Sequence, residues 1–569
     1  MLVLAGPGSG KTTVISERVR YLIEEKGVEP GRILIITFTK AAALEMQSRC
    51  QVICPKASMA VFGTFHSVYY HILRQTETYQ NFSLINEKEK KEIMKKIIPV
   101  GNMTELQHNY VCENMLKRIS LYKNSQKEES EDIALILKRY NQLCFEQAVM
   151  DFDDMLILCL KLLRENKEEC KKWQERFEYI LVDEFQDVNY CQYETLKILS
   201  EKCGNIFAVG DDDQAIYSFR GSDPGLMKKF LADFPDSKQI CLEDNYRSGE
   251  DIISCAGACI RCNRNRFAKN IVSKATFEHM VQVNRFEDGM QEMKDIITKI
   301  QETTQETAVL VRTNMQAEFV AETFSQNDIK FVFHEHRKCF YDNVWVKEIL
   351  AVLRFVFCGQ RRSDFFAFMN KPFRGFERTL FTEEKVDFKE IKQRLSKQKE
   401  YSEVKKELEK MEKIFRLMRG MEPYGAVLLV LNGMKFRTYV KESAEGTQMM
   451  QEQSEEVLEQ LLARAKDFRS VPEFLEYVSG YSRKNESENV QKNKEGVRIL
   501  TYHASKGLEF ERVFLPMLNE GSVPRGHIFT QEQLEEERRM FYVAITRAKR
   551  FLYLSYHGKE SVFLKEIST

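Results

Sequence analysis

The chain has 569 residues, and its 85 Lys and Arg equal its 85 Asp and Glu, so the formal net charge is zero. This balance argues against nucleic-acid binding through a basic tail, although a local basic groove is compatible with it. The length predicts roughly four domains. No apolar run reaches the ~18 residues needed to cross a bilayer, and the 14 scattered cysteines are typical of reduced intracellular thiols. We expect a cytoplasmic, multidomain enzyme with no membrane segment.

The start of the chain alternates strand and helix patterns, as in a parallel α/β sheet. Strands are predicted at residues 1–5 and 33–37, with a helix at 11–25 between them. Charged helical stretches then fill residues 87–147, and strand patterns return at 179–182 and 206–209. The helical stretch therefore looks like an insertion within one α/β domain.

A second α/β unit is predicted to follow the same plan. It begins with a strand at residues 308–311 and is interrupted by a charge-dense helical block over residues 382–481. Its strands resume at residues 497–500, 513–515 and 551–554. The chain is thus expected to hold two α/β cores, each interrupted by a helical insertion.

A phosphate-binding loop is predicted directly after the first strand. The segment Ala5-Gly6-Pro7-Gly8-Ser9-Gly10-Lys11-Thr12 lies between a strand and a helix, which is the context that such a loop requires. Gly6, Gly8, Ser9 and Gly10 would let backbone N–H groups point at phosphate oxygens. Lys11 would neutralise the outer phosphates, and Thr12 would bind Mg²⁺.

Two acids at the end of a buried strand complete the predicted nucleotide site. Asp183 and Glu184 follow the apolar residues 180–182, so both would lie at the carboxyl end of a strand near the phosphate loop. Asp183 would hold Mg²⁺, and Glu184 would polarise the attacking water.

The two acids also begin a series of motifs that resembles the UvrD/Rep/PcrA-type helicases of superfamily 1. Residues 183–187 (Asp-Glu-Phe-Gln-Asp) and residues 210–221 carry the first matches. Further matches, in the family's order, are residues 37–39, 63–67, 151–156, 245–248, 312–314, 370–375, 501–510 and 537–549. Because they are ordered and cover nearly the whole chain, the resemblance is specific.

The resemblance implies two RecA-like parallel-sheet motor domains, each with a helical insertion. The first would comprise residues 1–80 and 150–275, with its insertion at 81–149; the second would comprise residues 276–376 and 490–569, with its insertion at 377–489. It also implies an ATP-driven motor that moves 3′ to 5′ along single-stranded DNA, binds single-strand/duplex junctions, and acts in DNA repair or replication.

Roles for the nucleotide-site residues follow from the same resemblance. Arg247 and Arg547 look like two arginine fingers, Arg547 being supplied by the second domain, and Gln214 resembles the sensor of the γ-phosphate. Tyr246 would stack on adenine, Glu509 would contact ribose, and Thr13 stands near the base, where close relatives usually carry Arg.

DNA contacts are expected from aromatic rings, because stacking on bases does not depend on sequence. Phe38, Tyr217 and Phe219 are the candidate platforms, and Phe219 stands where the family commonly has Trp. Candidates for backbone or coupling contacts are Thr39, Thr64, His66, Arg220, Arg312, Asn314 and His503.

The chain departs from the family pattern in ways that leave alternatives open. Family members begin earlier, with a Gln that reads adenine, so adenine recognition here is expected to rest mainly on Tyr246; a start assigned too far downstream would explain this. Lys40-Ala41 replaces the usual Asn-Lys, and both insertions look short. A translocase without productive unwinding, or a non-catalytic truncated DNA-binding relative, therefore stays open beside the helicase.

One cysteine pattern resembles an iron–sulfur motif but is expected to be structural. Cys255, Cys259 and Cys262 recur at helical spacing within a helix predicted over residues 251–265, so packed thiols are the favoured interpretation.

Overall fold

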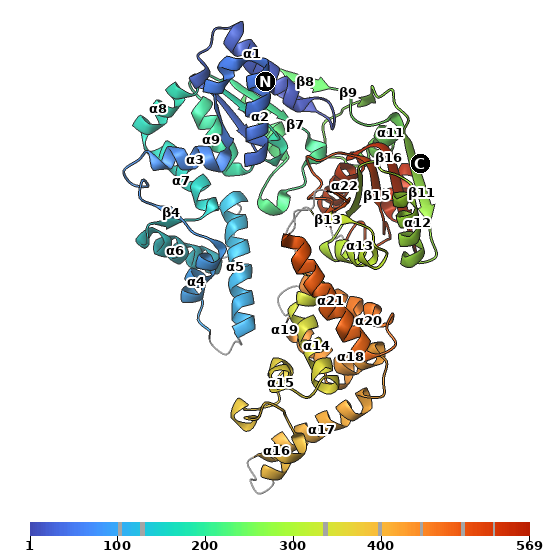
Figure 1. Ribbon diagram of the computed structural model, residues 1–569. Helices are drawn as coiled ribbons and strands as arrows, with labels where there is room; N and C mark the ends of the chain where they lie inside the picture. The colour runs from blue at the N-terminus through green and yellow to red at the C-terminus, as the bar shows by residue number, and fades with distance from the viewer. Residues whose placement is uncertain are drawn as a thin grey trace. The chain divides into compact units, whose positions relative to one another are not determined.

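The computed structural model describes residues 1–100, 105–125, 131–333, 339–395, 401–443, 448–490, 495–526 and 530–568 (Figure 1). Two compact units are present: residues 1–331 with 497–569 form unit 1, and residues 332–496 form unit 2. The first sheet lies in unit 1, and so do all strands of the second sheet except β13 (Phe331–Phe333), which continues into unit 2. Unit 2 starts at Val332, before the expected second insertion, and the domain boundaries given above stay predictions.

The first sheet has six strands in the order β3-β2-β6-β7-β1-β8, and neighbouring strands are parallel. Their bounds are β1 Leu2–Ala5, β2 Ile33–Thr37, β3 Val61–Thr64, β6 Tyr179–Val182, β7 Ile206–Gly210 and β8 Gln239–Leu242. Leu2 and Leu4 point into one core and Val3 and Ala5 into another. The nearly continuous apolar strands thus reflect a sheet that is covered on both faces.

Helices cover both faces of this sheet. On one face, α1 (Lys11–Glu24) and α2 (Lys40–Ile53) pack against each other and the strands. The opposite face carries α3 (Phe65–Arg74), α7 (Phe152–Glu165), α8 (Lys167–Arg176), α9 (Tyr190–Ser200) and α10 (Gly225–Asp233). Short 3₁₀ turns follow the strand ends: η3 (Phe185–Asp187), η4 (Asp212–Gln214) and η5 (Ser218–Arg220).

Three helices between β3 and β6 form a small body with its own core. They are α4 (Glu87–Ile97), α5 (Glu105–Ser125) and α6 (Glu131–Glu146), flanked by the paired short strands β4 (Ser83–Leu84) and β5 (Val149–Met150). The helical character expected for residues 87–147 is confirmed in this body. Residues 101–104 and 126–130 of the predicted insertion lie outside the described part of the chain.

The second sheet also has six strands, in the order β11-β16-β15-β12-β14-β13. Their bounds are β11 Met280–Arg285, β12 Thr307–Val311, β13 Phe331–Phe333, β14 Val497–Thr501, β15 Phe510–Leu515 and β16 Ala548–Tyr556. One face packs on α11 (Glu250–Ile260), α22 (Gln531–Ile545) and α23 (Val562–Ser568). The helices α12 (Gly289–Gln301) and α13 (Asn314–Gln326) also contact the sheet. Short strands β9 (Asp244–Asn245) and β10 (Val272–Ser273) pair beside the phosphate loop.

Unit 2 is helical, and its core is rich in phenylalanine. The helices are α14 (Val344–Phe357), α15 (Arg362–Phe368), α16 (Phe388–Arg394), α17 (Ser402–Met418), α18 (Pro423–Gly433), α19 (Phe436–Ser443), α20 (Gln448–Ala465) and α21 (Val471–Val490). Phe355 contacts Phe365, Phe368, Phe388 and Phe415. The described part of the block predicted over residues 382–481 is largely helical from Phe388 on, and residues 396–400 and 444–447 of it lie outside the described part of the chain. Helices α14 and α15 were not predicted.

The cysteine-bearing helix is confirmed, but its predicted end was wrong. Helix α11 stops at Ile260, because Asn263 and the N–H of Arg264 bond instead to Glu535 of α22. Cys255 and Cys259 are buried in the core around α11, as predicted. Cys262 lies beyond the end of α11 and is exposed, so the prediction of a packed thiol was wrong for this residue. All 14 cysteines carry free thiols, and none of the described helices has the length and apolarity to cross a membrane.

Candidate nucleotide and DNA sites

The phosphate loop curls between β1 and α1 as its sequence predicts. Gly8 and Gly10 have φ values of 65° and 85°, which glycine adopts without strain. Ser9 Oγ donates to the carbonyl of Gly6 (2.8 Å), and Lys11 Nζ donates to the carbonyl of Ala5 (3.1 Å). The lysine is thus folded back over its own loop at the N-terminus of α1, where backbone N–H groups and the helix dipole favour anions.

The segment after β8 holds this loop in place. Asn245 Nδ2 donates to the carbonyl of Pro7 (2.5 Å), and the N–H of Tyr246 donates to the carbonyl of Gly8 (3.0 Å). A Cβ at Gly8 would lie 2.6 Å from the Cβ of Arg247. The contact therefore leaves room only for glycine, and Arg247 starts from a fixed position beside the phosphate loop.

Asp183 and Glu184 differ in how readily they ionise. Burial, together with the charge of Glu184, raises the pKa of Asp183 to about 7. Burial also opposes ionisation of Glu184, but the charges of Lys11 and Lys506 outweigh it and lower its pKa. Glu184 has a φ of 50°, an unusual value for a residue with a side chain. One carboxylate is thus kept ionised beside the phosphate loop, whereas the charge of Lys11 only partly offsets the burial of its neighbour.

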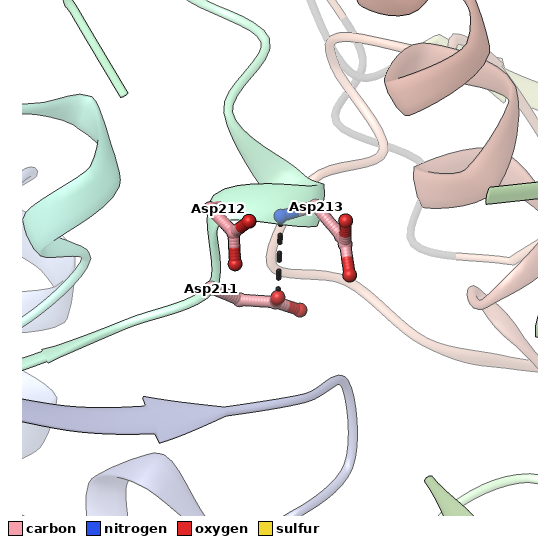
Figure 2. A group of neighbouring side chains, drawn as sticks. All are labelled: Asp211, Asp212 and Asp213. Atoms are coloured by element: carbon pink, nitrogen blue, oxygen red, sulfur yellow. Dashed lines mark hydrogen bonds between the residues drawn. The ribbon is translucent and has the colours of Figure 1, made fainter. Parts of the chain in front are cut away.

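Gln214 lies on an acidic turn formed by Asp211, Asp212 and Asp213. Figure 2 shows the three carboxylates around this turn, with the N–H of Asp213 donating to Asp211 Oδ1 (3.3 Å). Their ligand atoms lie within 4.8 Å of one another, a spacing that could suit a metal ion. Lys269 Nζ instead contacts all three carboxylates, so a lysine already neutralises the turn.

Arg547 is 2% exposed and directly precedes β16. Its guanidinium donates to the carbonyls of Val543 (2.8 Å) and Leu508 (3.1 Å) and to the hydroxyl of Thr546 (3.1 Å). Burial, with the nearby charge of Arg247, lowers its pKa to about 9. This buried cation has no described carboxylate in an ion pair with it, as expected of a group that receives an anionic ligand.

The predicted nucleotide-site residues come together across the two sheets of unit 1. Arg247 Nε forms an ion pair with Glu509 (2.5 Å) from the second sheet, and Ser248 Oγ donates to the carbonyl of Ala548 (2.6 Å). The charge of Lys11 stabilises ionised Glu184, and Glu184 in turn acts on Arg547. The phosphate loop and Arg547 thus face one site. Tyr246 beside it is 65% exposed, while Thr12 is half-buried and Thr13 is exposed.

The aromatic candidates for DNA binding form one cluster. Phe38 and Tyr217 stack with ring centroids 5.2 Å apart, and Phe219 contacts Tyr217 (6.0 Å) and His503 (5.4 Å) edge-on. Phe219 is 58% exposed, and the guanidinium of Arg220 lies over the rings of both Tyr217 and Phe219. An exposed ring beside a cation is the combination that a stacked base requires.

The cluster opens into a groove of about 780 Å³ between the first sheet and the α4–α6 body. Phe38, His66, Tyr217, Phe219 and Arg220, all predicted DNA contacts, line it together with lysines of α4 and α5. Acidic side chains line it as well. The groove is therefore suited to a strand held by stacking and local cations rather than by a strongly basic surface.

The remaining DNA candidates have other contacts or lie outside the groove lining. Thr39 caps α2 and Thr64 caps α3 through their hydroxyl groups, and Asn314 is exposed at the start of α13. Arg312 forms a two-point ion pair with Glu537. Burial and the charge of Arg312 lower the pKa of His503 to about 4, so its ring is neutral at physiological pH. Their roles in binding DNA stay predictions.

Three residues without a predicted role connect the parts of the site. Asn245 fixes the phosphate loop, and Lys269 neutralises the acidic turn. Lys506 Nζ donates to Asp187 (2.5 Å) and to the carbonyl of Gln214 (2.8 Å), and it lies 4.9 Å from the centre of the Tyr217 ring. Asn245 and Lys506 lie within the motifs that carry the family resemblance, which was the available signal; Lys269 had none.

Comparison with known proteins agrees with this arrangement. The chain matches the model of the UvrD/REP helicase N-terminal domain over residues 1–235 and that of the UvrD-like helicase C-terminal domain over residues 240–559. It is 32% identical to the putative ATP-dependent DNA helicase YjcD of Bacillus subtilis, aligning 98% of this chain with 76% of the relative. It is 30% identical to DNA helicase II of Haemophilus influenzae (99% and 83%) and 29% identical to the ATP-dependent DNA helicase Rep of Buchnera aphidicola (99% and 93%). The chain therefore belongs to the UvrD/REP helicase family.

Proposed function

We propose that the protein is an ATP-driven motor that moves 3′ to 5′ along single-stranded DNA and unwinds duplexes from single-strand/duplex junctions. Membership of the UvrD/REP family, with ATP-dependent DNA helicases as relatives along nearly the whole chain, makes it a DNA-dependent ATPase and helicase. The observation that carries the mechanism is that residues of both sheets meet at one site. Arg247 forms an ion pair with Glu509. The charge of Lys11 keeps Glu184 ionised, and Glu184 in turn acts on Arg547.

ATP hydrolysis is assigned to residues from both sheets. The backbone of the phosphate loop and Lys11 hold the phosphates, and Glu184 is ionised and so able to orient and polarise a water molecule. Arg247 and Arg547 stabilise charge on the transferred phosphoryl group, as arginine fingers do. Since Arg547 precedes a strand of the second sheet, it acts only when both sheets approach the nucleotide.

Mg²⁺ fits the oxygen donors beside the phosphate loop. Asp183 is a buried carboxylate whose own surroundings disfavour ionisation, a state that a divalent cation would reverse. The hydroxyl of Thr12 supplies a second oxygen, and Mg²⁺ prefers oxygen ligands shared with substrate phosphates. When bound, the metal neutralises charge on the phosphates; Asp183 and Thr12 are the residues that would hold it.

The groove lined by the aromatic cluster is proposed as the track for single-stranded DNA. Phe38, Tyr217 and Phe219 offer stacking surfaces, and Arg220 lies over two of these rings. Stacking recognises bases without reading their sequence, which suits a motor that must pass every base. We place the activity in the cytoplasm on nucleoid DNA, in repair or replication.

ATPase assays with and without single-stranded DNA test this proposal. We expect DNA to stimulate hydrolysis by the wild type and Lys11→Ala to abolish it; a rate that stays at background in both would favour the non-catalytic alternative. Direction is tested by displacement of streptavidin from biotinylated strands: a 3′-to-5′ motor clears the 5′ end. Duplexes with a 3′ tail then distinguish a helicase from a translocase, because a translocase alone leaves them paired.

A further inference from the structure

Lys269 is a buried lysine with three carboxylate partners next to the nucleotide site. Its side chain is 1% exposed, and its Nζ contacts Asp211, Asp212 (2.5 Å) and Asp213 (2.8 Å). Arg266 adds a second cation, with two hydrogen bonds to Asp213 (2.8 and 2.6 Å). The turn in Figure 2 is thus held by two basic residues from one distant segment.

That segment, residues 264–274, we call the strap. At one end the N–H of Arg264 donates to Glu535 of α22 (2.9 Å). At the other end Val272 and Ser273 pair with β9, and the N–H of Lys274 donates to the carbonyl of Asn245 (2.7 Å). The side chain of Ile271 also lies against Gly6 of the phosphate loop. The strap is therefore fixed on both sides of Lys269, which limits how far the lysine can move.

Two chains of hydrogen bonds run from Asp211, one of the partners of Lys269, to Gln214 and to Glu184. Asp211 Oδ2 accepts from Gln214 Nε2 (2.6 Å), which orients the proposed γ-phosphate sensor. The N–H of Asp211 donates to Gln186 Oε1 (2.9 Å), and Gln186 Nε2 donates to Glu184 Oε2 (2.5 Å). Asp211 thus holds Gln214, the proposed sensor, through its side chain. Through its backbone N–H it holds Gln186, which contacts the water-polarising Glu184.

We propose that Lys269 is a positioning residue for ATP hydrolysis, which holds Asp211 in place so that Gln214 and, through Gln186, Glu184 meet the nucleotide correctly. This inference rests on the proposed ATPase function. Three adjacent buried carboxylates repel one another unless cations neutralise them. Without Lys269, Asp211 would rotate away or take up a proton, and in both cases the amide of Gln214 would lose its charged acceptor.

The test compares Lys269→Met with a matched control, Arg266→Met, in the full-length protein. Both variants remove one positive charge that the strap supplies to the same turn, but only Lys269 contacts Asp211. We expect Lys269→Met to lower the kcat of DNA-stimulated hydrolysis about tenfold to hundredfold, with KM for ATP within about threefold of the wild type. Arg266→Met should retain a kcat at least about threefold higher than that of Lys269→Met.

Two further variants separate positioning from folding. Lys269→Arg keeps the charge and should recover most of the lost rate. Adding Lys269→Met to Gln214→Ala should lower kcat by clearly less than Lys269→Met lowers it in the wild type, since both variants break the contact between Gln214 and Asp211 and only the path through Gln186 remains. If Lys269→Met does not fold, the double variant Lys269→Met/Asp212→Asn, which relieves the repulsion but leaves Asp211 without its cation, takes its place.

These experiments distinguish failure of the positioning role of Lys269 from failure of the proposed ATPase function. A wild type without DNA-stimulated hydrolysis would reject the function itself. A wild type that hydrolyses ATP, combined with equal losses in Lys269→Met and Arg266→Met, or with fully additive effects of Lys269→Met and Gln214→Ala, would overturn the positioning role alone.

Discussion

Replacing Arg547 with methionine should make the nucleotide-free protein more stable and abolish hydrolysis. In the structure the guanidinium is buried, and its hydrogen bonds go to two carbonyls and one hydroxyl rather than to a carboxylate. Burial and the charge of Arg247 lower its pKa from above 12 to about 9. At neutral pH the side chain still carries its charge, so the folded state bears the cost of burying it.

The size of this cost follows from the pKa. Each pKa unit corresponds to 1.36 kcal/mol, so burying charged Arg547 near Arg247 costs on the order of 5 kcal/mol. Methionine removes that cost but also three hydrogen bonds, each worth about 1 kcal/mol. We therefore expect Arg547→Met to raise the free energy of unfolding by about 1 to 3 kcal/mol and the thermal midpoint by a few degrees.

A control variant on helix α22, Arg538→Met, is expected to be less stable than the wild type. Arg538 on α22 is also buried, but it forms two hydrogen bonds with Glu566 (both 2.8 Å). Arg538→Met would leave Glu566 without this partner and should lower the thermal midpoint.

The assays are thermal unfolding without nucleotide, ATP binding, and DNA-stimulated hydrolysis. Arg547→Met should bind ATP yet lose about 10³-fold or more in kcat. Two results would refute the reasoning. Near-normal turnover by Arg547→Met would show that Arg547 takes no part in the reaction. A loss of stability equal to that of Arg538→Met would show that burying the charge of Arg547 carries no cost.

Other expected outcomes test the link to DNA. Lys506→Met removes the contacts with Asp187 and the carbonyl of Gln214, so the DNA-stimulated rate should fall about tenfold more than the DNA-free rate; equal losses would contradict a coupling role. Phe219→Ala should weaken binding of single-stranded DNA by about 1 to 3 kcal/mol, and an unchanged affinity in fluorescence anisotropy would exclude Phe219 as a platform. Because burial and Arg312 lower the pKa of His503 to about 4, His503→Ala and the wild type should show the same change in DNA affinity between about pH 5.5 and about pH 8. A change in DNA affinity near pH 6 that occurs in the wild type but not in His503→Ala would show that His503 does titrate there.

The sequence predicts those parts of the site that depend on local order along the chain. The phosphate loop lies between a strand and a helix, and the apolar run before Asp183 marks the end of a buried strand; both features are readable within a few residues. In contrast, α14 was missed because its sequence, Val344–Phe357, is mostly apolar and buried, with few charged residues. Such an apolar run can belong to a buried strand as well as to a helix.

Contacts between distant residues could not be predicted in the same way. Lys269 lies 58 positions from Asp211, and Lys506 lies 319 positions from Asp187. A lysine in a charge-rich chain carries no sign of its partner, since partners of buried charges are set by the fold rather than by spacing. The early end of α11 has the same cause: a distant residue, Glu535, bonds to the residues that would otherwise extend the helix.

Buried cations that stabilise the fold can be told apart from buried cations that bind a ligand by their partners within the chain. Lys123 pairs with Asp151 and Asp154, and Lys269 pairs with the acidic turn. These buried cations have carboxylate partners within the chain, so they stabilise the fold. Arg547 is as deeply buried but has only carbonyl and hydroxyl acceptors. A bound triphosphate would supply the negative charge that Arg547 lacks. Because the second sheet carries Arg547, binding of the triphosphate would then draw the second sheet toward the first.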